Sequence, residues 1–453
     1  STDSRRMMLG RPIGTTDIVL FLLLACAAKI GLMLGIEGAF NIQDHFTVKN
    51  FPQSFYEKQW WQYLLPHADI YGTWTATSVV AAALLQQHIP PAIVLVTSHC
   101  VLIITGFFVT LSITRSMVFA ATAAILFVTV PFNFHVHSSQ GTTAHAMLLS
   151  YFLITVHSIY LLMHRQSVVR WAYLAVSAFL FILGYETWLD TVIVLLVLTP
   201  AIIFVLRKNG QENLVKRFTV LPLSAVGVTI VYVFIKVVFG FGSGAGSETE
   251  LLLFYPSILA MIDDFMVKMV SFSFTAVSLV LPGFLTGSLS LPTHGADWII
   301  GQQNGYHGQM QFLTYMNHVF LWRIHAGVSF VVLLGLGAWA LRRLSQGKRD
   351  WQSWMILICV AMLLFGAATH NMVKYRPMHS MPYLGYQVWV NVLGAIGLMG
   401  LAIDALVKWV EPRRQWLTLF FCWSGLVFTG FSVRSKLTVE AATMTMGNYP
   451  SLF

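Results

Sequence analysis

Side chains that could do chemistry gather in four short segments, which separate long apolar runs of this chain. They supply carboxylates, imidazoles and cations, and a site that combines these groups could move protons and hold an anionic substrate. The candidate residues in these segments are Asp44, His45, His135, His137, Gln140, Glu186, Lys374, Arg376 and His379. A topology that exposes all four segments on one membrane face could bring them to a single cavity.

Two carboxylates are the candidate catalytic groups. Asp44 follows the first apolar run by a few residues, where it is either a solvated loop residue or a proton acceptor. Glu186 lies four residues before Asp190, so the two carboxylates share one face if this turn is helical. Ordinary turn residues would show the same spacing, and both interpretations of Glu186 stay open.

The histidines and Gln140 are candidate substrate-binding groups. His135 and His137 are two residues apart, so their rings point the same way only on a strand. No third ligand is evident beside them, which favours hydrogen bonding over a metal site. No cofactor is therefore predicted with a defined ligand set, and a divalent metal stays one alternative.

Three cations are candidates for binding an anionic substrate. Arg376 carries a planar, permanently charged fork that suits a phosphate ester, and Lys374 lies two residues before it. Both could instead anchor in lipid headgroups. Lys29 lies inside the first apolar run, where a lysine is costly and usually faces a polar cavity or partner. The sequence does not name that partner.

The composition places these residues in a membrane protein. Of 453 residues, 57% are hydrophobic and 10% are charged, with a mean hydropathy of +0.70. A soluble domain carries about 25% charged residues, so lipid must cover much of this chain. The net charge of +9 sits in short clusters between apolar runs, which indicates topology determinants and no nucleic-acid partner. All four cysteines lie within apolar runs, with no disulfide or metal spacing.

Eleven apolar runs are long enough for a helix to span a bilayer, which takes about 17–25 residues. They are 15–37, 91–113, 117–135, 146–163, 170–186, 189–206, 218–240, 322–341, 353–370, 382–407 and 415–431. We therefore predict one integral membrane domain over 1–453, an all-α bundle of about 11 spans. Two long outer loops cover 38–90 and 241–321. In the second, the apolar stretches at 251–262 and 265–285 form either two interfacial helices or a further pair of spans.

Basic residues predict the orientation. With a cytoplasmic N-terminus, 17 of the 27 basic residues fall in cytoplasmic segments, as the positive-inside rule requires. They are Arg5, Arg6, Arg11, Arg115, Arg165, Arg170, Arg207, Lys208, Lys216, Arg217, Arg342, Arg343, Lys348, Arg349, Lys408, Arg413 and Arg414. A full span at 73–85 would invert every later loop, so this stretch is predicted to be re-entrant or interfacial. The C-terminus is then outside. The lack of an Asn-x-Ser/Thr sequon favours a bacterial inner membrane.

The order of these features resembles the GT-C superfamily of membrane glycosyltransferases, in particular protein O-mannosyltransferases and lipid A aminoarabinose transferases. That family has one span, then a long outer loop with an early acid and amphipathic helices, which Asp44 and the stretches 51–65 and 73–85 match. Ser139-Gln140 occupies the place of a Ser-Gln motif in the next outer loop. Tyr375-Arg376-Pro377 is similar to a late arginine-aromatic-proline segment.

The resemblance implies an enzyme that moves sugar from a polyprenyl-phosphate donor to an unknown acceptor on the outer face. Asp44 would be the base that activates the acceptor hydroxyl. Arg376, with Lys374, would hold the lipid phosphate and stabilise its charge as it leaves. The short outer loop at 133–140 lacks the acidic pair that oligosaccharyltransferases of this superfamily carry in their second outer loop, which argues against a metal site built from Asp44 and such a pair.

Other membrane functions stay open. A transporter or flippase could use Lys29 and the outer acids, although no internal repeat is present and the polar residues favour one face. A polysaccharide ligase or polymerase would use the same donor chemistry. An O-acyltransferase would need a buried histidine, for which His157 and His325 are candidates. A non-enzymatic assembly subunit, with membrane-protein partners, is the remaining alternative.

Overall fold

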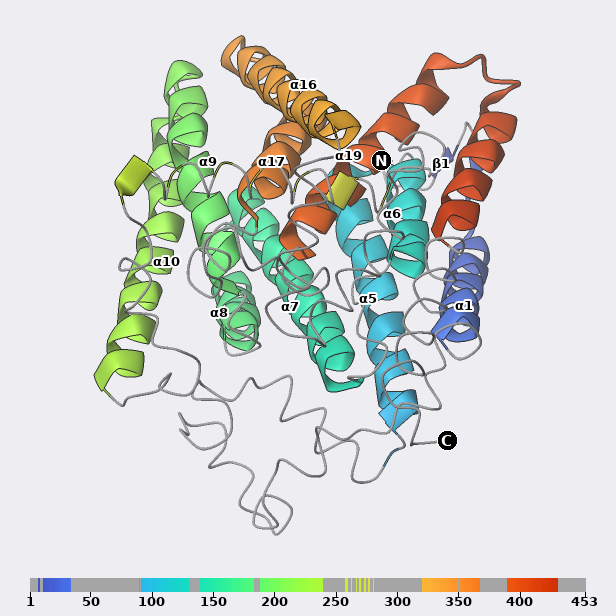
Figure 1. Ribbon diagram of the computed structural model, residues 1–453, viewed down its shortest axis with the longest axis horizontal. Helices are drawn as coiled ribbons and strands as arrows, with labels where there is room; N and C mark the ends of the chain where they lie inside the picture. Colours follow the sequence, from blue (N-terminus) through green and yellow to red (C-terminus); the bar gives the residue numbers. More distant parts are fainter. Residues whose placement is uncertain are drawn as a thin grey trace.

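The computed structural model describes about half of the chain, and nearly all of that part is helical. It covers residues 7–8, 11–33, 89, 91–130, 139–182, 188–238, 257–259, 262, 266, 269, 273, 276–277, 280, 320–348, 350–366 and 389–430. A small antiparallel pair of strands, β1 (Met7–Met8) and β2 (Arg11–Pro12), precedes the first helix. The helices that follow pack side by side as a bundle (Figure 1).

A helix lies at each of the eleven predicted apolar runs. The helices are α1 (Thr15–Gly31), α5 (Pro91–Thr114), α6 (Met117–Thr129), α7 (Ser139–His164), α8 (Val168–Ile182), α9 (Trp188–Lys208), α10 (Glu212–Val238), α16 (Phe320–Ser345), α17 (Trp351–Phe365), α19 (Trp389–Trp409) and a last helix at 415–430. Six of these described helices are long and apolar enough to cross a membrane, namely α5, α7, α9, α10, α16 and α19. The chain is therefore a helical membrane protein.

Several helix boundaries differ from the prediction, and the sequence explains two of these differences directly. The run predicted at 117–135 stops as a helix at Thr129, and Val130 is extended with φ −70° and ψ 128°. Residue 131 is proline, whose ring disfavours the helical conformation of the residue before it. Helix α7 begins at Ser139, seven residues before the predicted run at 146. The first two turns of this helix contain polar residues, so their low hydropathy placed them outside the predicted apolar run.

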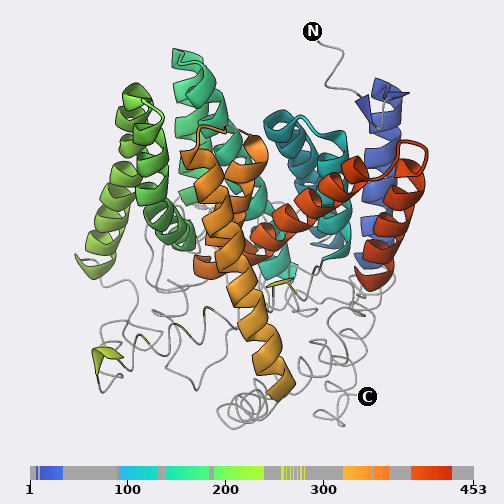
Figure 2. The ribbon, with the colours of Figure 1, turned by 90° about the horizontal axis from the view of Figure 1, so that it is seen from above.

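The short connections gather at one end of the bundle. They are 115–116, 165–167, 209–211, 346–350 and 410–414, and they lie at the upper end in both views (Figures 1 and 2). Lysines and arginines flank all five, and we call this end the basic end. The basic residues among the described ones here are Arg115, Arg165, Arg170, Arg207, Lys208, Lys216, Arg217, Arg342, Arg343, Lys348, Lys408, Arg413 and Arg414.

The opposite end of the bundle is the distal end, which is the lower end in Figure 2. There α1, α6, α8, α10 and α17 finish and α5, α7, α9, α16 and α19 start. Successive described helices thus run in alternating directions. Residues 34–90 connect α1 to α5 in the sequence, and both helix ends to which this segment is attached are distal. The junctions of 239–319 with α10 and α16 are distal as well.

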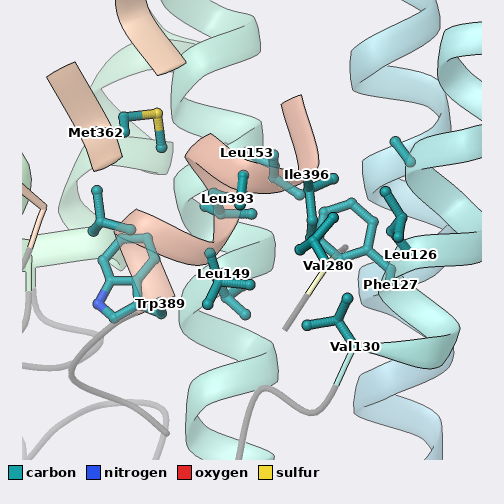
Figure 3. Packing of buried hydrophobic residues seen from close by; sticks show 14 of the residues in the cluster. Leu126, Phe127, Val130, Leu149, Leu153, Val280, Met362, Trp389, Leu393 and Ile396 are labelled. Carbon is teal, nitrogen blue, oxygen red and sulfur yellow. The ribbon is translucent and has the colours of Figure 1, made fainter. Parts of the chain in front are cut away.

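Helix α6 is central to the bundle. Every residue of α6 except Ile125 is buried, and α6 packs against α1, α5 and α19. Glycines let the neighbouring helices come close: a Cβ on Gly400 of α19 would lie 2.8 Å from the Phe119 ring. Figure 3 shows the apolar cluster beside this contact, where Phe127 and Ile396 lie among leucines from several helices. Small residues at helix contacts are typical of membrane bundles.

A buried carboxylate fixes α19 to the start of α6 at the basic end. Asp404 is 1% exposed, and the Ser116 hydroxyl donates to its Oδ1 at 2.6 Å. Ser116 is also the N-cap of α6, because its Oγ accepts from the Phe119 N–H at 3.2 Å. Lys408 donates to the other carboxylate oxygen at 2.5 Å and supplies the countercharge. Both carboxylate oxygens of Asp404 thus accept a hydrogen bond, as a buried charge requires.

Described positions between 269 and 280 contribute a further buried face. Met269, Ser273, Ala276 and Val280 are helical and buried, and they recur every three to four residues. The apolar three pack against the core cluster, and Val280 lies close to Phe127 and Ile396 in Figure 3. This part of the apolar stretch predicted at 265–285 therefore packs against the bundle.

Candidate functional site

Most residues predicted for the site lie outside the described part of the chain. These are Asp44, His45, His135, His137, Glu186, Lys374, Arg376 and His379. The loop regions at 38–90 and 241–321 also lie outside it, apart from position 89, ten positions between 257 and 280, and positions 320–321. Two predicted residues are described. Gln140 belongs to the first turn of α7 instead of a loop, and Lys29 lies in the last turn of α1.

Lys29 is fully enclosed at the distal end. Its residue is 1% exposed, and its Nζ donates to the Val128 carbonyl oxygen at 3.3 Å. Val128 lies in the last turn of α6, where carbonyls have no partner within their own helix. The negative end of the α6 dipole also favours a cation at this place. The predicted polar partner of Lys29 thus includes a helix terminus.

Shortening Lys29 is expected to destabilise the protein. Lys29→Ala removes the donor to Val128 and leaves a cavity where the lysine stem packed, at a cost of about 2–4 kcal/mol. Thermal unfolding in detergent, followed by fluorescence-detected size exclusion, measures the change. Lys29→Met restores most of the stem, so its difference from Lys29→Ala isolates the packing part. Lys216→Met, at an exposed lysine of the basic end, is the control. Equal melting of Lys29→Ala and wild type would contradict the capping role.

A second helix end is capped in a similar way. The Leu363 carbonyl, in the last turn of α17, accepts from Asn391 Nδ2 at 2.6 Å and from Ser273 Oγ at 2.6 Å. Asn391 belongs to the first turn of α19 and is 1% exposed. Because its amide nitrogen faces Leu363, its Oδ1 faces away. In the described structure this buried Oδ1 accepts no hydrogen bond.

Both capped helices are shorter than the hydrocarbon layer. At 1.5 Å per residue, the 13 residues of α6 and the 15 residues of α17 span about 20 Å and 22 Å, against about 30 Å for a bilayer core. Helix ends at such a depth need polar partners or a wet cavity, because lipid offers no hydrogen bonds. Lys29, Asn391 and Ser273 supply those partners. Polar side chains are therefore buried at these two helix ends, within an otherwise apolar interior.

Two tryptophans begin helices at the distal end. Trp188 starts α9 and Trp389 starts α19, and they are 3% and 1% exposed. Trp188 packs edge-to-face on Tyr232, and Trp389 packs the same way on Phe152, with ring centroids 5.3 Å apart. Neither indole N–H has an acceptor in the part of the chain that the structure describes. Buried indole N–H groups normally find one.

Three of these residues were not predicted to have a role. Asn391, Asp404 and Trp389 all lie within the apolar run at 382–407, which was predicted to be a plain membrane span. A signal was present, because an aspartate and an asparagine inside an apolar run are costly and usually have a role. In the searched part of the chain, no group of three histidine, cysteine or acidic residues is placed to hold a metal.

Comparisons with known proteins identify no relative. No protein-family model matches this chain, and no curated protein or solved structure matches it at a significant level.

Proposed function

We propose that this helical membrane protein is a glycosyltransferase of GT-C type, which transfers sugar from a polyprenyl-phosphate donor on the extracytoplasmic side of a bacterial inner membrane. The observation that carries the proposal is the separation of the two ends of the bundle. Basic turns gather at one end, whereas the described helix ends that flank the candidate residues are at the other.

The basic end is then cytoplasmic by the positive-inside rule. The segment with Asp44 joins α1 and α5 at the distal end, and the segment with Arg376 joins α17 and α19 there. Residues 183–187, which include Glu186, connect α8 to α9 at the same end. All of these groups are therefore within chain reach of the extracytoplasmic face, where lipid-linked sugars would be used.

In this proposal Asp44 is the base and Glu186 a second catalytic carboxylate. Asp44 takes the proton of the acceptor hydroxyl as that oxygen bonds to the anomeric carbon, and the bond to the lipid phosphate breaks. Arg376 and Lys374 stabilise the departing phosphate. His45, His135, His137, Gln140 and His379 bind the polar parts of donor and acceptor.

A transporter is the second candidate, and the short central helices favour it. Secondary transporters bind substrate near the membrane midplane beside interrupted helices. The ends of α6 and α17, with buried Lys29 and Asn391, have this character. Many secondary transporters are built from internal repeats, and this sequence shows no internal repeat, which favours the transferase.

The deciding experiment uses purified protein in nanodiscs. A radiolabelled sugar on polyprenyl phosphate is supplied together with membrane extract as a source of acceptors, and label is followed into extractable products. Transfer that depends on the protein supports the proposal. If no label moves, while proteoliposomes that contain the protein accumulate or flip the same donor, the transporter replaces it. No movement of label in either assay would overturn both the transferase and the transporter, and would leave the assembly-subunit alternative.

A further inference from the structure

We propose that the start of α19 binds the phosphate of the lipid donor through the indole N–H of Trp389. The inference rests on the proposed function, since it names where the phosphate of that donor lies. Two observations carry it. A helix of 21 residues begins here at the distal end, and its first side chain is a buried donor without an acceptor in the described structure.

The first turn of a helix suits an anion. Its N–H groups have no partner within the helix, and the positive end of the helix dipole is centred there. The first turn of α19 contains no acidic residue that would already occupy this position. Side chains of a helix lean toward its N-terminus, so the indole of a first residue lies beside these N–H groups.

The ring of Trp389 is fixed by other aromatic side chains. It packs nearly perpendicular to Phe152 of α7 and Phe181 of α8, at interplanar angles of 78° and 79°. Figure 3 shows the indole nitrogen on the side of the ring that faces away from Leu149 and Leu393. The N–H is therefore aimed out of the apolar cluster in one fixed direction. Such a preset donor loses little entropy when it binds an oxygen.

The start of α9 provides an internal comparison. Trp188 is also a first residue, also buried, and its N–H likewise has no acceptor among the described residues. The first turn of α9, however, contains Asp190, which is 1% exposed. A carboxylate at this position competes with a second anion for the same helix end. Of these two helix starts, the one at α19 is thus the one suited to phosphate.

The burial of Trp389 favours a phosphate carried by lipid. Its nitrogen has no contact with bulk water, so the acceptor must enter between protein elements. A phosphate on a prenyl chain can do so from the bilayer, because the chain remains in an apolar surrounding. The apolar contacts of the chain help offset the loss of phosphate hydration, and a free phosphate ion has no such contribution.

Trp389→Phe tests the site, because it removes the N–H while the aromatic packing remains. Binding of a fluorescent long-chain polyprenyl phosphate to the protein in nanodiscs is measured for wild type, Trp389→Phe and Trp188→Phe. We expect Trp389→Phe to weaken binding about tenfold, the effect of one hydrogen bond to a charged acceptor. Trp188→Phe should stay within about twofold of wild type, since its helix start already contains a carboxylate.

Competing ligands separate the possible sources of the phosphate. The free polyprenol should bind wild type and Trp389→Phe equally, because it offers no anionic oxygen. Phosphatidic acid should compete in wild type if any lipid phosphate fits, and inorganic phosphate should not compete. The inference is overturned if Trp389→Phe binds polyprenyl phosphate as tightly as wild type does. Tight, phosphate-dependent binding without any sugar transfer would support this site and overturn the transferase instead.

Discussion

Asp44→Asn is expected to lower the rate of sugar transfer by about 10²–10⁴-fold, the usual contribution of a general base. Asparagine has nearly the same shape but cannot take the proton of the acceptor hydroxyl. Donor affinity should change little, because the carboxylate acts on the acceptor. Single-turnover transfer from labelled donor measures the rate, and donor titration measures the affinity.

Arg376→Ala should change donor binding as well as the rate of transfer. The guanidinium binds the phosphate in the ground state and stabilises its charge on leaving, so both donor affinity and turnover should fall. Glu411→Gln and Arg414→Ala are matched controls at the basic end, where both side chains are about three-quarters exposed. If Asp44→Asn and Arg376→Ala retain the turnover of these controls, the mechanism is wrong.

Gly394→Ala is expected to destabilise the bundle although it adds one methyl group. A Cβ on Gly394 would lie 2.7 Å from the Cys359 carbonyl oxygen and 3.1 Å from the Leu363 backbone nitrogen. Both obstacles belong to the α17 backbone, so no side-chain rotation relieves the clash. Helices α17 and α19 must separate, at an expected cost of about 1–3 kcal/mol. The melting temperature of the purified protein reports this change.

Gly335→Ala is the matched control for this substitution. Gly335 is an exposed residue within α16, and nothing lies within 4 Å of its added Cβ. Alanine is the better helix former by about 1 kcal/mol, so this variant should melt at or above the temperature of wild type. If both variants melt alike, the close approach of α17 and α19 does not limit stability.

The positions of the helices were predictable because lipid demands long apolar runs. The run at 189–206 corresponds to α9, Trp188–Lys208, with a shift of only a few residues. Helix boundaries were less predictable, because hydropathy does not show where a helix ends. Helix α6 ends before Val130, which precedes a proline, although the sequence stays apolar. Helix α7 begins at Ser139, although its first residues are polar.

The partners within the site could not be predicted in the same way. The burial cost of Lys29 indicated that it has a partner, and one partner is the Val128 carbonyl, 99 residues away in the chain. Every residue has a carbonyl, so no residue type marks this acceptor in the sequence. The link from Asn391 to Leu363 has the same character. Packing of the helices decides both contacts.

The five tight turns have a consequence for how the chain is made. Only residues 115–116 separate α5 from α6, so α6 cannot stay outside the membrane once α5 has inserted. We therefore expect the two helices to insert together. The same holds for α7 with α8, α9 with α10, α16 with α17 and α19 with the helix at 415–430. Their cationic turns would remain on the side of the ribosome. We therefore expect these five helix pairs to insert as hairpins.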